Sequence, residues 1–183
     1  MSESVQPQSF HLKNGTAAVI REAQPSDAGE LIDFVNTVGG ESDFLIRGAN
    51  EFDMTEKEEA EFLAKCQATA DHIYLIAEVE GRIAGTLHFA TGRRPRVRHS
   101  GEFGMSVSKK YWGQGIGSRL LDALLEWTKE TDTVKKINLR VRADNDRAVK
   151  LYERKGFVWE GTLTNEMCVD GQYFDLYAMG LNV

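Results

Sequence analysis

Apolar and polar residues along the chain follow two spacings, and each spacing is typical of one kind of element. Apolar residues three or four positions apart, or a capping residue ahead of a charged run, predict helices at 26–38, 55–69, 116–128 and 145–156. Alternating apolar and polar residues predict strands at 17–22, 73–80, 82–91, 99–107, 136–142, 157–169 and 173–181. Because the two patterns are interspersed along the chain, we expect an α/β domain.

Two of the predicted helices begin at recognisable capping residues. Ser26 is expected to cap the first helix. Thr55 is expected to cap the second, with Glu58 as its capping-box partner three residues later. The segment between them, 39–53, has no regular pattern but contains several apolar side chains. We therefore expect a loop or short helix there that packs against the domain.

The connections between the predicted strands indicate a mixed sheet. Segments 99–107, 116–128 and 136–142 form a strand, a helix and a strand, and such a crossover makes the two strands parallel neighbours or near neighbours. Short turns at Gly81 and at Asp170-Gly171 predict antiparallel hairpins. We place the domain at residues 17–183 and treat residues 1–16 as a partly flexible N-terminal extension.

Composition and charge narrow the choice of partners. The 183 residues include 42% hydrophobic and 27% charged residues, which is ordinary for a water-soluble globular domain. The formal net charge of -6 argues against binding to nucleic acid or to an anionic membrane, because like charges repel. With no apolar run of membrane-spanning length and no secretory pattern at the N-terminus, we expect a cytoplasmic protein.

Cysteines and a basic run supply further candidate chemistry. Cys66 and Cys168 stand far apart, without histidines at metal-binding spacing, so we expect neither a metal site nor a disulfide. The run from Arg93 to His99 contains four arginines. Two interpretations remain open for it: a solvated hairpin tip, or recognition of an acidic acceptor or of a cofactor phosphate.

The glycine-rich segment Gly113-Gln114-Gly115-Ile116-Gly117-Ser118 directly follows a predicted strand and opens a predicted helix. Glycines allow successive backbone N–H groups to turn toward one point, and the helix N-terminus adds unpaired donors, so this junction suits an anionic ligand. The segment lacks the Gly-Lys-Ser/Thr ending of a Walker loop and the pattern of a dinucleotide fingerprint. A tight strand-to-helix turn without a ligand is the alternative.

A second motif follows at residues 145–157. Asn145 can cap a helix there, and Gly156 can end it. Tyr152 lies on the apolar face, where Phe or Leu would pack equally well. The pattern therefore indicates that the tyrosine hydroxyl has a use of its own.

Both motifs carry a resemblance to a known family. Trp112 to Gly117 resembles the pyrophosphate loop Arg/Gln-x-x-Gly-x-Gly/Ala of the GNAT superfamily of N-acetyltransferases, with Trp112 in the first place. Residues 145–157 resemble the family's second signature, Asn-x-x-Ala-x-x-x-Tyr-x-x-x-Gly-Phe, and residues 160–179 look like the ending of the branch with ribosomal-protein N-terminal and spermidine acetyltransferases. The resemblance implies a single-domain GNAT-like fold with a twisted, mostly antiparallel mixed sheet of about six to seven strands and about four helices.

The same resemblance implies an activity. It is the transfer of an acetyl group from acetyl-CoA to a primary amine by direct attack in a ternary complex. The acceptor would be a small amine (polyamine, amino acid or amino sugar) or a protein N-terminus, and the alternative is a noncatalytic acyl-CoA-binding or sensing module. An exposed edge at the terminal strand suits a homodimer. The cofactor would contact Met105, Val107, Trp112, Gly113, Gln114, Gly115, Ile116, Gly117, Ser118, Asn145 and Tyr152.

Acetyl transfer to an amine needs a proton donor and a proton acceptor. Tyr152 is the expected acid, because a phenol stays protonated at neutral pH and can donate to the leaving thiolate. Glu102 is the expected base, since some family members place a glutamate on the strand before the glycine loop. By strand alternation Glu102 would line whatever Ser106 lines. An ordinary surface glutamate is the other interpretation, and His88, His99 and Ser100 are competing bases.

Overall fold

A sheet with the strand order β1-β2-β3-β4-β5-β6-β8-β7 runs through the computed structural model, which describes residues 5–183. Its strands, within these residues, are β1 (Gln8–His11), β2 (Ala17–Glu22), β3 (His72–Val79), β4 (Arg82–Thr91), β5 (Ser100–Val107), β6 (Lys136–Arg142), β7 (Val158–Val169) and β8 (Gln172–Asn182). The α-helices there are α1 (Ala28–Glu41), α2 (Glu56–Ala68), α3 (Ile116–Lys129) and α4 (Asp146–Arg154). The mixed α/β architecture and the four helices are confirmed, and the sheet has eight strands rather than six or seven.

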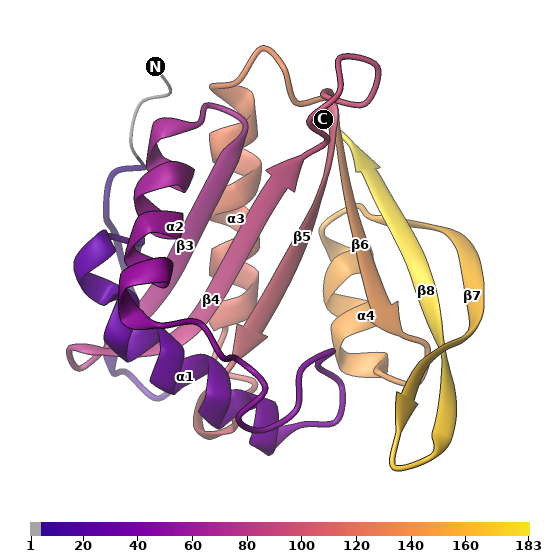
Figure 1. Cartoon of the computed structure of the whole chain (residues 1–183), viewed down its shortest axis with the longest axis horizontal. Helices are drawn as coiled ribbons and strands as arrows, with labels where there is room; N and C mark the ends of the chain where they lie inside the picture. Colours follow the sequence, from indigo (N-terminus) through magenta and orange to yellow (C-terminus); the bar gives the residue numbers. More distant parts are fainter. Residues whose placement is uncertain (1–4) are drawn as a thin grey trace.

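The sheet divides between β5 and β6. These strands are parallel, as the predicted crossover requires, but they pair only over Ser100–Glu102 and Lys136–Asn138. Every other neighbouring pair is antiparallel. Beyond the short paired region β5 and β6 diverge, and the ribbon shows them separating toward one end of the molecule (Figure 1). The later residues of β5 therefore have one free backbone edge.

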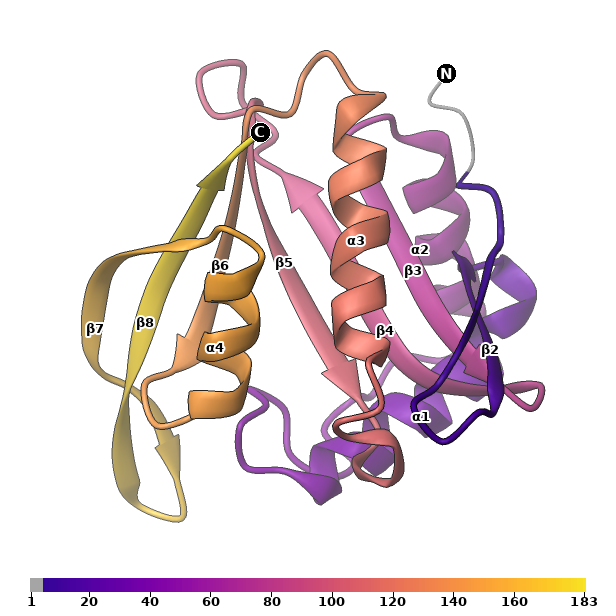
Figure 2. The ribbon, with the colours of Figure 1, turned by 180° about the vertical axis from the view of Figure 1, so that it is seen from behind.

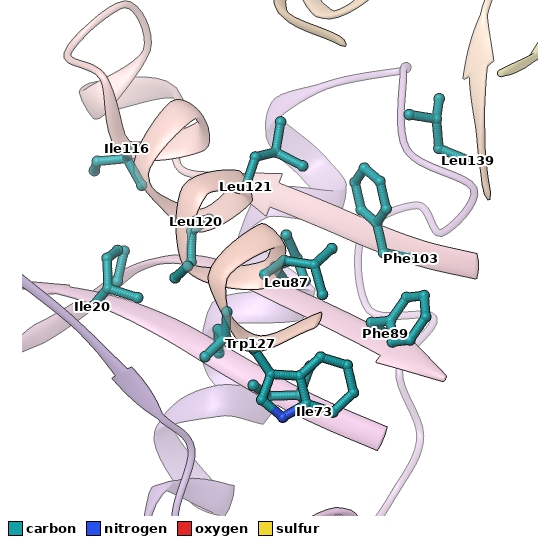
Figure 3. Packing of buried hydrophobic residues seen from close by; sticks show 14 of the residues in the cluster. Ile20, Ile73, Leu87, Phe89, Phe103, Ile116, Leu120, Leu121, Trp127 and Leu139 are labelled. Atoms are coloured by element: carbon teal, nitrogen blue, oxygen red, sulfur yellow. The ribbon is translucent and has the colours of Figure 1, made fainter. Parts of the chain in front are cut away.

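Helices cover both faces of the sheet. The helices α1 and α2 lie across one face (Figure 1), while α3 and α4 lie on the opposite face (Figure 2). Figure 3 shows the core between α3 and the strands, where Leu120, Leu121 and Trp127 of the helix lie among strand side chains that include Ile73 and Leu87. All five of these side chains are buried. Ile116, in the first turn of α3, is buried in the same core, which holds the N-terminus of this helix against the sheet.

The N-terminal segment contributes a strand. Residues of β1 pair with β2, with Gln8 opposite Ile20 and His11 opposite Ala17. Leu12, in the turn between these strands, is buried in the main core. The sequence analysis placed the start of the domain at residue 17, but the sheet begins earlier, at Gln8. Residues 1–4, which belong to the expected flexible extension, lie outside the described residues.

The capping predictions have different outcomes. Thr55 caps α2, and Glu58 completes the capping box. The prediction that Ser26 caps the first helix is wrong, because Ser26 lies inside a short 3-10 turn, Pro25–Asp27, and α1 begins only at Ala28. The helix also continues to Glu41. Gly39 allows the loop after α1 to fold back onto the helix, because a Cβ there would collide with the carbonyl oxygen of Gly48.

Candidate active site

One cavity of about 1110 Å³ connects the two faces of the sheet near the point where β5 and β6 separate. At one end it is lined by the β1–β2 turn, the glycine-rich segment and the first turn of α3. At the other end it is lined by the end of α1, the following loop and strands β3 and β4. Residues from β5, β6 and α4 line the part between them. The cavity therefore has two differently lined ends that are joined through its middle.

The glycine-rich turn at one end has the backbone of an anion-binding site. Gly113 and Gly115 have positive φ angles of +76° and +99°, and no protein atom lies within 4 Å of where their Cβ atoms would be. Gly115 is the N-cap of α3, so the first amides of that helix lack intrahelical partners. The Gln114 side chain accepts a hydrogen bond from the backbone N–H of Asn14 at 3.2 Å. Donors, open space and the positive helix end thus coincide here.

A third glycine brings three elements close together. A Cβ on Gly117 would lie 3.3 Å from Cδ2 of Leu151 and 3.4 Å from Cε of Met105. Leu151 belongs to α4 and Met105 to β5, so both elements approach the first turn of α3. A larger residue at 117 would push α4 or the Met105 side chain away from the cavity.

Trp112 lines the cavity with its ring, and its indole N–H is already used in a hydrogen bond within the protein. Its indole N–H donates to the carbonyl of Val107 at 2.7 Å, and the guanidinium carbon of Arg147 lies 3.9 Å from the ring centre. Lys13, Arg119 and Arg154 also line this end of the cavity. Four cations from three segments, the β1–β2 turn, α3 and α4, therefore line the cavity near the anion-binding turn.

Tyr152 lies in α4 on the wall of the cavity. Its ring packs edge-to-face against Phe103 at 5.8 Å and Phe157 at 6.0 Å. Burial raises the pKa of Tyr152 to about 12, and this desolvation is the sole cause of the shift. The phenol is consequently protonated at neutral pH. Asn145, which caps α4 by accepting from the Ala148 N–H at 3.3 Å, also lines the cavity, about two helical turns before Tyr152.

Glu102 does not line the cavity, so the prediction that it lines whatever Ser106 lines is wrong. Its carboxylate is half exposed and lies 3.6 Å from the guanidinium of Arg140. Both residues do share a strand face, but four residues of β-strand separate them by roughly 13 Å. Ser106 lines the cavity, with its hydroxyl 3.0 Å from that of Thr86.

The other end of the cavity is formed by the loop after α1 together with strands β3 and β4. Leu45, Ile46 and Arg47 of that loop line it, together with Tyr74 of β3 and His88 of β4. The Tyr74 and His88 rings are stacked, with centroids 5.4 Å apart. This end is mainly aromatic and aliphatic, with a few polar groups at fixed positions, as small-molecule sites commonly are.

Arg142 holds this loop against the far half of the sheet. The arginine lies at the end of β6 with only 8% of its side chain exposed. It donates to the carbonyl of Asp43 at 3.0 Å and makes a two-pronged ion pair with Asp144. Its guanidinium carbon also lies 4.6 Å from the Phe44 ring centre and 3.8 Å from that of Phe174. The loop is thereby connected to β6 and β8 across the gap in the sheet.

Comparison with known proteins gives this geometry a family. A family model described as "Acetyltransferase (GNAT) family" matches residues 43–157. The chain belongs to this GNAT family. The matched range includes the glycine-rich turn, Tyr152 and most of the loop after α1.

Curated relatives agree with this family. An L-amino acid N-acetyltransferase of Escherichia coli is 33% identical over 105 residues, covering 57% of this chain and 65% of that protein. A spermidine N(1)-acetyltransferase of Vibrio cholerae is 34% identical over 83 residues, covering 45% and 48%. The ribosomal protein uS5-alanine N-acetyltransferase of E. coli is 28% identical over 109 residues, covering 60% and 56%. The chain spans about half to two thirds of the length of these relatives, and the suspected GNAT branch is confirmed.

Solved structures of GNAT proteins match over more of the chain. A GNAT-family acetyltransferase from Streptococcus pneumoniae is 36% identical with a TM-score of 0.88, covering 91% of this chain and 99% of that one. A Salmonella typhimurium protein, solved with its cofactor acetyl-CoA, has a TM-score of 0.73 at 18% identity, covering 90% and 93%. The second likeness shows a shared fold.

Most residues that the GNAT resemblance selected lie together. Every residue expected to contact the cofactor lines the cavity, whereas the competing bases His99 and Ser100 do not. The sequence analysis missed Phe10, His11 and Lys13, because they lie in the segment treated as an extension. It also missed Tyr74 and Arg47, for which no motif exists.

Two other sequence features lie away from the cavity. The basic run Arg93 to His99 lies in the β4–β5 connection, at the opposite end of the sheet from the loop after α1 (Figure 1), and Arg98 pairs with Asp71 at 2.8 Å. Cys168 is exposed on β7, while Cys66 is buried.

Within residues 5–183, no helix combines the length and the apolar character that crossing a membrane requires.

Proposed function

We propose that this chain transfers an acetyl group from acetyl-CoA to a primary amine, by direct attack of the amine while both substrates are bound. One observation carries the proposal: a single cavity joins an anion-binding glycine turn, a buried tyrosine and a separate pocket walled by the loop after α1. A cofactor with phosphates at one end and a reactive group at the other fits such an arrangement. The solved relative with bound acetyl-CoA supports the choice of cofactor.

The cofactor end would be held mainly by backbone. The amides of Gly115, Ile116 and Gly117 would bind the pyrophosphate, and the surrounding cations would neutralise its charge. Beyond Glu102, β5 has no partner on its β6 side, so its free backbone groups are available to an extended ligand arm. Met105 and Val107 would flank that arm, because both line the cavity.

When bound, acetyl-CoA supplies a thioester, whose acyl group is activated toward amines. Tyr152 would then donate a proton to the departing sulfur, since its pKa of about 12 keeps it protonated. Asn145 would position the ligand arm or a water molecule beside it. Holding the two substrates in contact supplies much of the rate, because orientation of this kind is worth roughly 7–11 kcal/mol.

The base remains Glu102 in this proposal, acting at a distance. Because Glu102 does not line the cavity, it would take the amine proton through water along the strand face that it shares with Ser106. Proton transfer through one or more water molecules is a recognised form of general-base catalysis. The carboxylate is half exposed, so water reaches it.

The acceptor end would take a small amine or the N-terminus of a polypeptide. The names of the curated relatives include L-amino acids, spermidine and a ribosomal protein, and all three kinds of acceptor present a primary amine. The cavity wall at this end contains both aromatic rings and the Glu41 carboxylate. Such a wall suits a cationic amine that also carries an aliphatic portion.

The test is acetyl-CoA consumption, measured as release of free thiol, against a panel of polyamines, amino acids, amino sugars and N-terminal peptides. Calorimetric titration with acetyl-CoA is run beside it. We expect binding together with thiol release on one class of acceptor. Binding without turnover on any acceptor would favour the noncatalytic acyl-CoA-binding module, and absence of binding would contradict the whole proposal.

A further inference from the structure

Three potential metal ligands meet between α2 and the sheet. Cys66 comes from α2, His72 from β3 and His88 from β4, and one ligand atom from each lies within 4.8 Å of the others. In residues 5–183 no other group of three His, Cys, Asp or Glu side chains is gathered this closely. Cys66 and His72 are six residues apart and His88 follows sixteen residues later, which matches no familiar metal-binding spacing, so the sequence gave no sign of the cluster.

The strand register explains why the histidines are neighbours. Tyr74 pairs with His88, and His72 lies two residues before Tyr74, so His72 and His88 occupy the same face of the sheet. Their ring centroids are 6.2 Å apart. Cys66 lies above them in α2, with its Sγ 3.9 Å from Nε2 of His88. Phe62 and Tyr74 pack against the His88 ring and limit its movement.

These distances can be compared with those of a zinc site. Zn–S bonds near 2.3 Å and Zn–N bonds near 2.0–2.1 Å in a tetrahedron place ligand atoms roughly 3.4–3.6 Å apart. The Cys66–His88 separation of 3.9 Å is close to this value. The remaining contraction, on the order of 1 Å, falls within the side-chain rotation available to the partly exposed His72.

We propose that Cys66, His72 and His88 form a binding site for a thiophilic divalent cation of the Zn²⁺ type. The cation would replace the proton of the Cys66 thiol, forming a metal–sulfur bond and releasing one H⁺, while the two imidazoles bind as neutral ligands through nitrogen. One thiolate and two imidazoles favour a borderline-soft metal over Mg²⁺ or Ca²⁺, which prefer oxygen ligands. A water molecule would complete the coordination.

A reactive thiol is a poorer explanation of the cluster. Burial, followed in importance by the nearby Glu59 and Glu22 carboxylates, raises the pKa of the Cys66 thiol to about 11. Without a metal the sulfur is therefore a protonated and weak nucleophile, so it is unsuited to carrying an acetyl group. Burial and the neighbouring His72 lower the pKa of His88 to about 4, which leaves its imidazole neutral as a ligand must be.

The location gives the metal a connection to the cavity. His88 lines the acceptor end, whereas Cys66 and His72 do not. A cation bound to His88 would therefore hold this side chain of the cavity wall in place from the side of α2. Metal binding by these three side chains does not depend on the acetyltransferase reaction.

The test uses the full chain carrying C168S, which removes the other thiol. Zn²⁺ affinity is measured by competition with a chromogenic chelator, and Co²⁺ is added as a spectroscopic substitute. We expect one metal per chain, retained in excess Mg²⁺, with a thiolate-to-cobalt charge-transfer band. C66A should abolish that band, and both C66A and H72Q should weaken Zn²⁺ binding by roughly tenfold or more. H99Q, which changes a histidine outside the cluster, should bind like the parent.

Folding is checked by metal-free thermal unfolding of each variant. If C66A fails to fold, H72Q decides the matter, because His72 is only partly buried. Absence of binding by the parent, a cobalt spectrum without the thiolate band, or equal affinities for H72Q and H99Q would each overturn the proposal.

Discussion

The guanidinium of Arg147 stacks on the ring of Trp112 with 3.9 Å between its central carbon and the ring centre. Trp112 occupies the position where the family's phosphate loop has Arg or Gln, and Arg147 comes from the second motif. An arginine is therefore present at this end of the cavity even though the loop itself lacks one. A planar guanidinium suits both the stacking and the binding of phosphate.

Replacing Arg147 should weaken cofactor binding. R147A removes a charged partner worth roughly 1.5–3 kcal/mol, so we expect the Kd for acetyl-CoA to rise by about one to two orders of magnitude in calorimetry. R147K should give an intermediate value, since lysine keeps the charge but loses the planar stack. R82A, an exposed arginine outside the cavity, serves as the control. An R147A affinity equal to that of R82A would exclude this role.

Removing the Tyr152 hydroxyl should slow turnover and spare binding. Y152F keeps the ring that packs against Phe103 and Phe157. Loss of a general acid typically costs about 10²-fold or more, so we expect kcat to fall by that order while the Kd for acetyl-CoA stays the same. Y173F, at an exposed tyrosine on β8, is the matched control. Unchanged turnover in Y152F would remove the residue from the mechanism.

The raised pKa of Tyr152 leads to a prediction for the pH dependence of kcat. The proposed role of this residue needs the protonated phenol, and burial moves the pKa of Tyr152 upward to about 12 from an ordinary value near 10. Because a raised pKa delays loss of the proton as pH rises, kcat should show no decline centred near pH 10. The measurement is kcat between about pH 7 and 10.5, corrected for spontaneous thioester hydrolysis. A descending limb near pH 10 that Y152F lacks would contradict the shifted pKa.

Glu102 and Glu166 provide a paired test of the base. Both carboxylates lie beside Arg140, at 3.6 Å and 3.7 Å. If Glu102 accepts the amine proton, E102Q should lower kcat by about 10²-fold, whereas E166Q should have little effect. Both variants weaken the pairing with Arg140 to a similar degree. Equal kcat values for the two variants would mean that Glu102 has a surface role only.

Weakening the loop attachment should affect the acceptor more than the cofactor. R142M removes the hydrogen bond to the Asp43 carbonyl and the ion pair with Asp144, which together hold the loop after α1. We expect the KM for the amine to rise by roughly tenfold, with stability lowered by about 1–3 kcal/mol. The Kd for acetyl-CoA should change little, because Arg142 lies outside the cavity lining. A parallel rise in both constants would indicate general damage to the fold.

The sequence predicted those parts of the molecule that depend on local patterns. The crossover from β5 through α3 to β6 follows from periodicity, and the two signatures locate the glycine turn and Tyr152 because each motif is a short contiguous segment. The capping box of Thr55 and Glu58 is equally local. Such features are determined by residues a few positions apart.

Features that depend on distance through the fold could not be predicted in this way. Strand alternation gave the correct face for Glu102 but carried no information on where along β5 the cavity begins. The pairing of β1 depends on β2 offering an open edge. In the sequence Arg142 is one more arginine in an alternating strand, and only the fold gives it two aromatic neighbours, Phe44 of the loop after α1 and Phe174 of β8.

Different parts of the sequence build the two ends of the cavity that lies where β5 and β6 separate. The glycine-rich turn and Tyr152 come from residues 105–152, whereas the opposite end of the cavity is walled mainly by residues 35–47 and by strands β3 and β4. Substitutions in the loop after α1 can thus change the shape offered to an amine while the thioester stays where it is. If the chain transfers acetyl groups as proposed, acceptor choice would depend largely on this one connection, and exchanging it while keeping Tyr74 and His88 would be a route to a different acceptor.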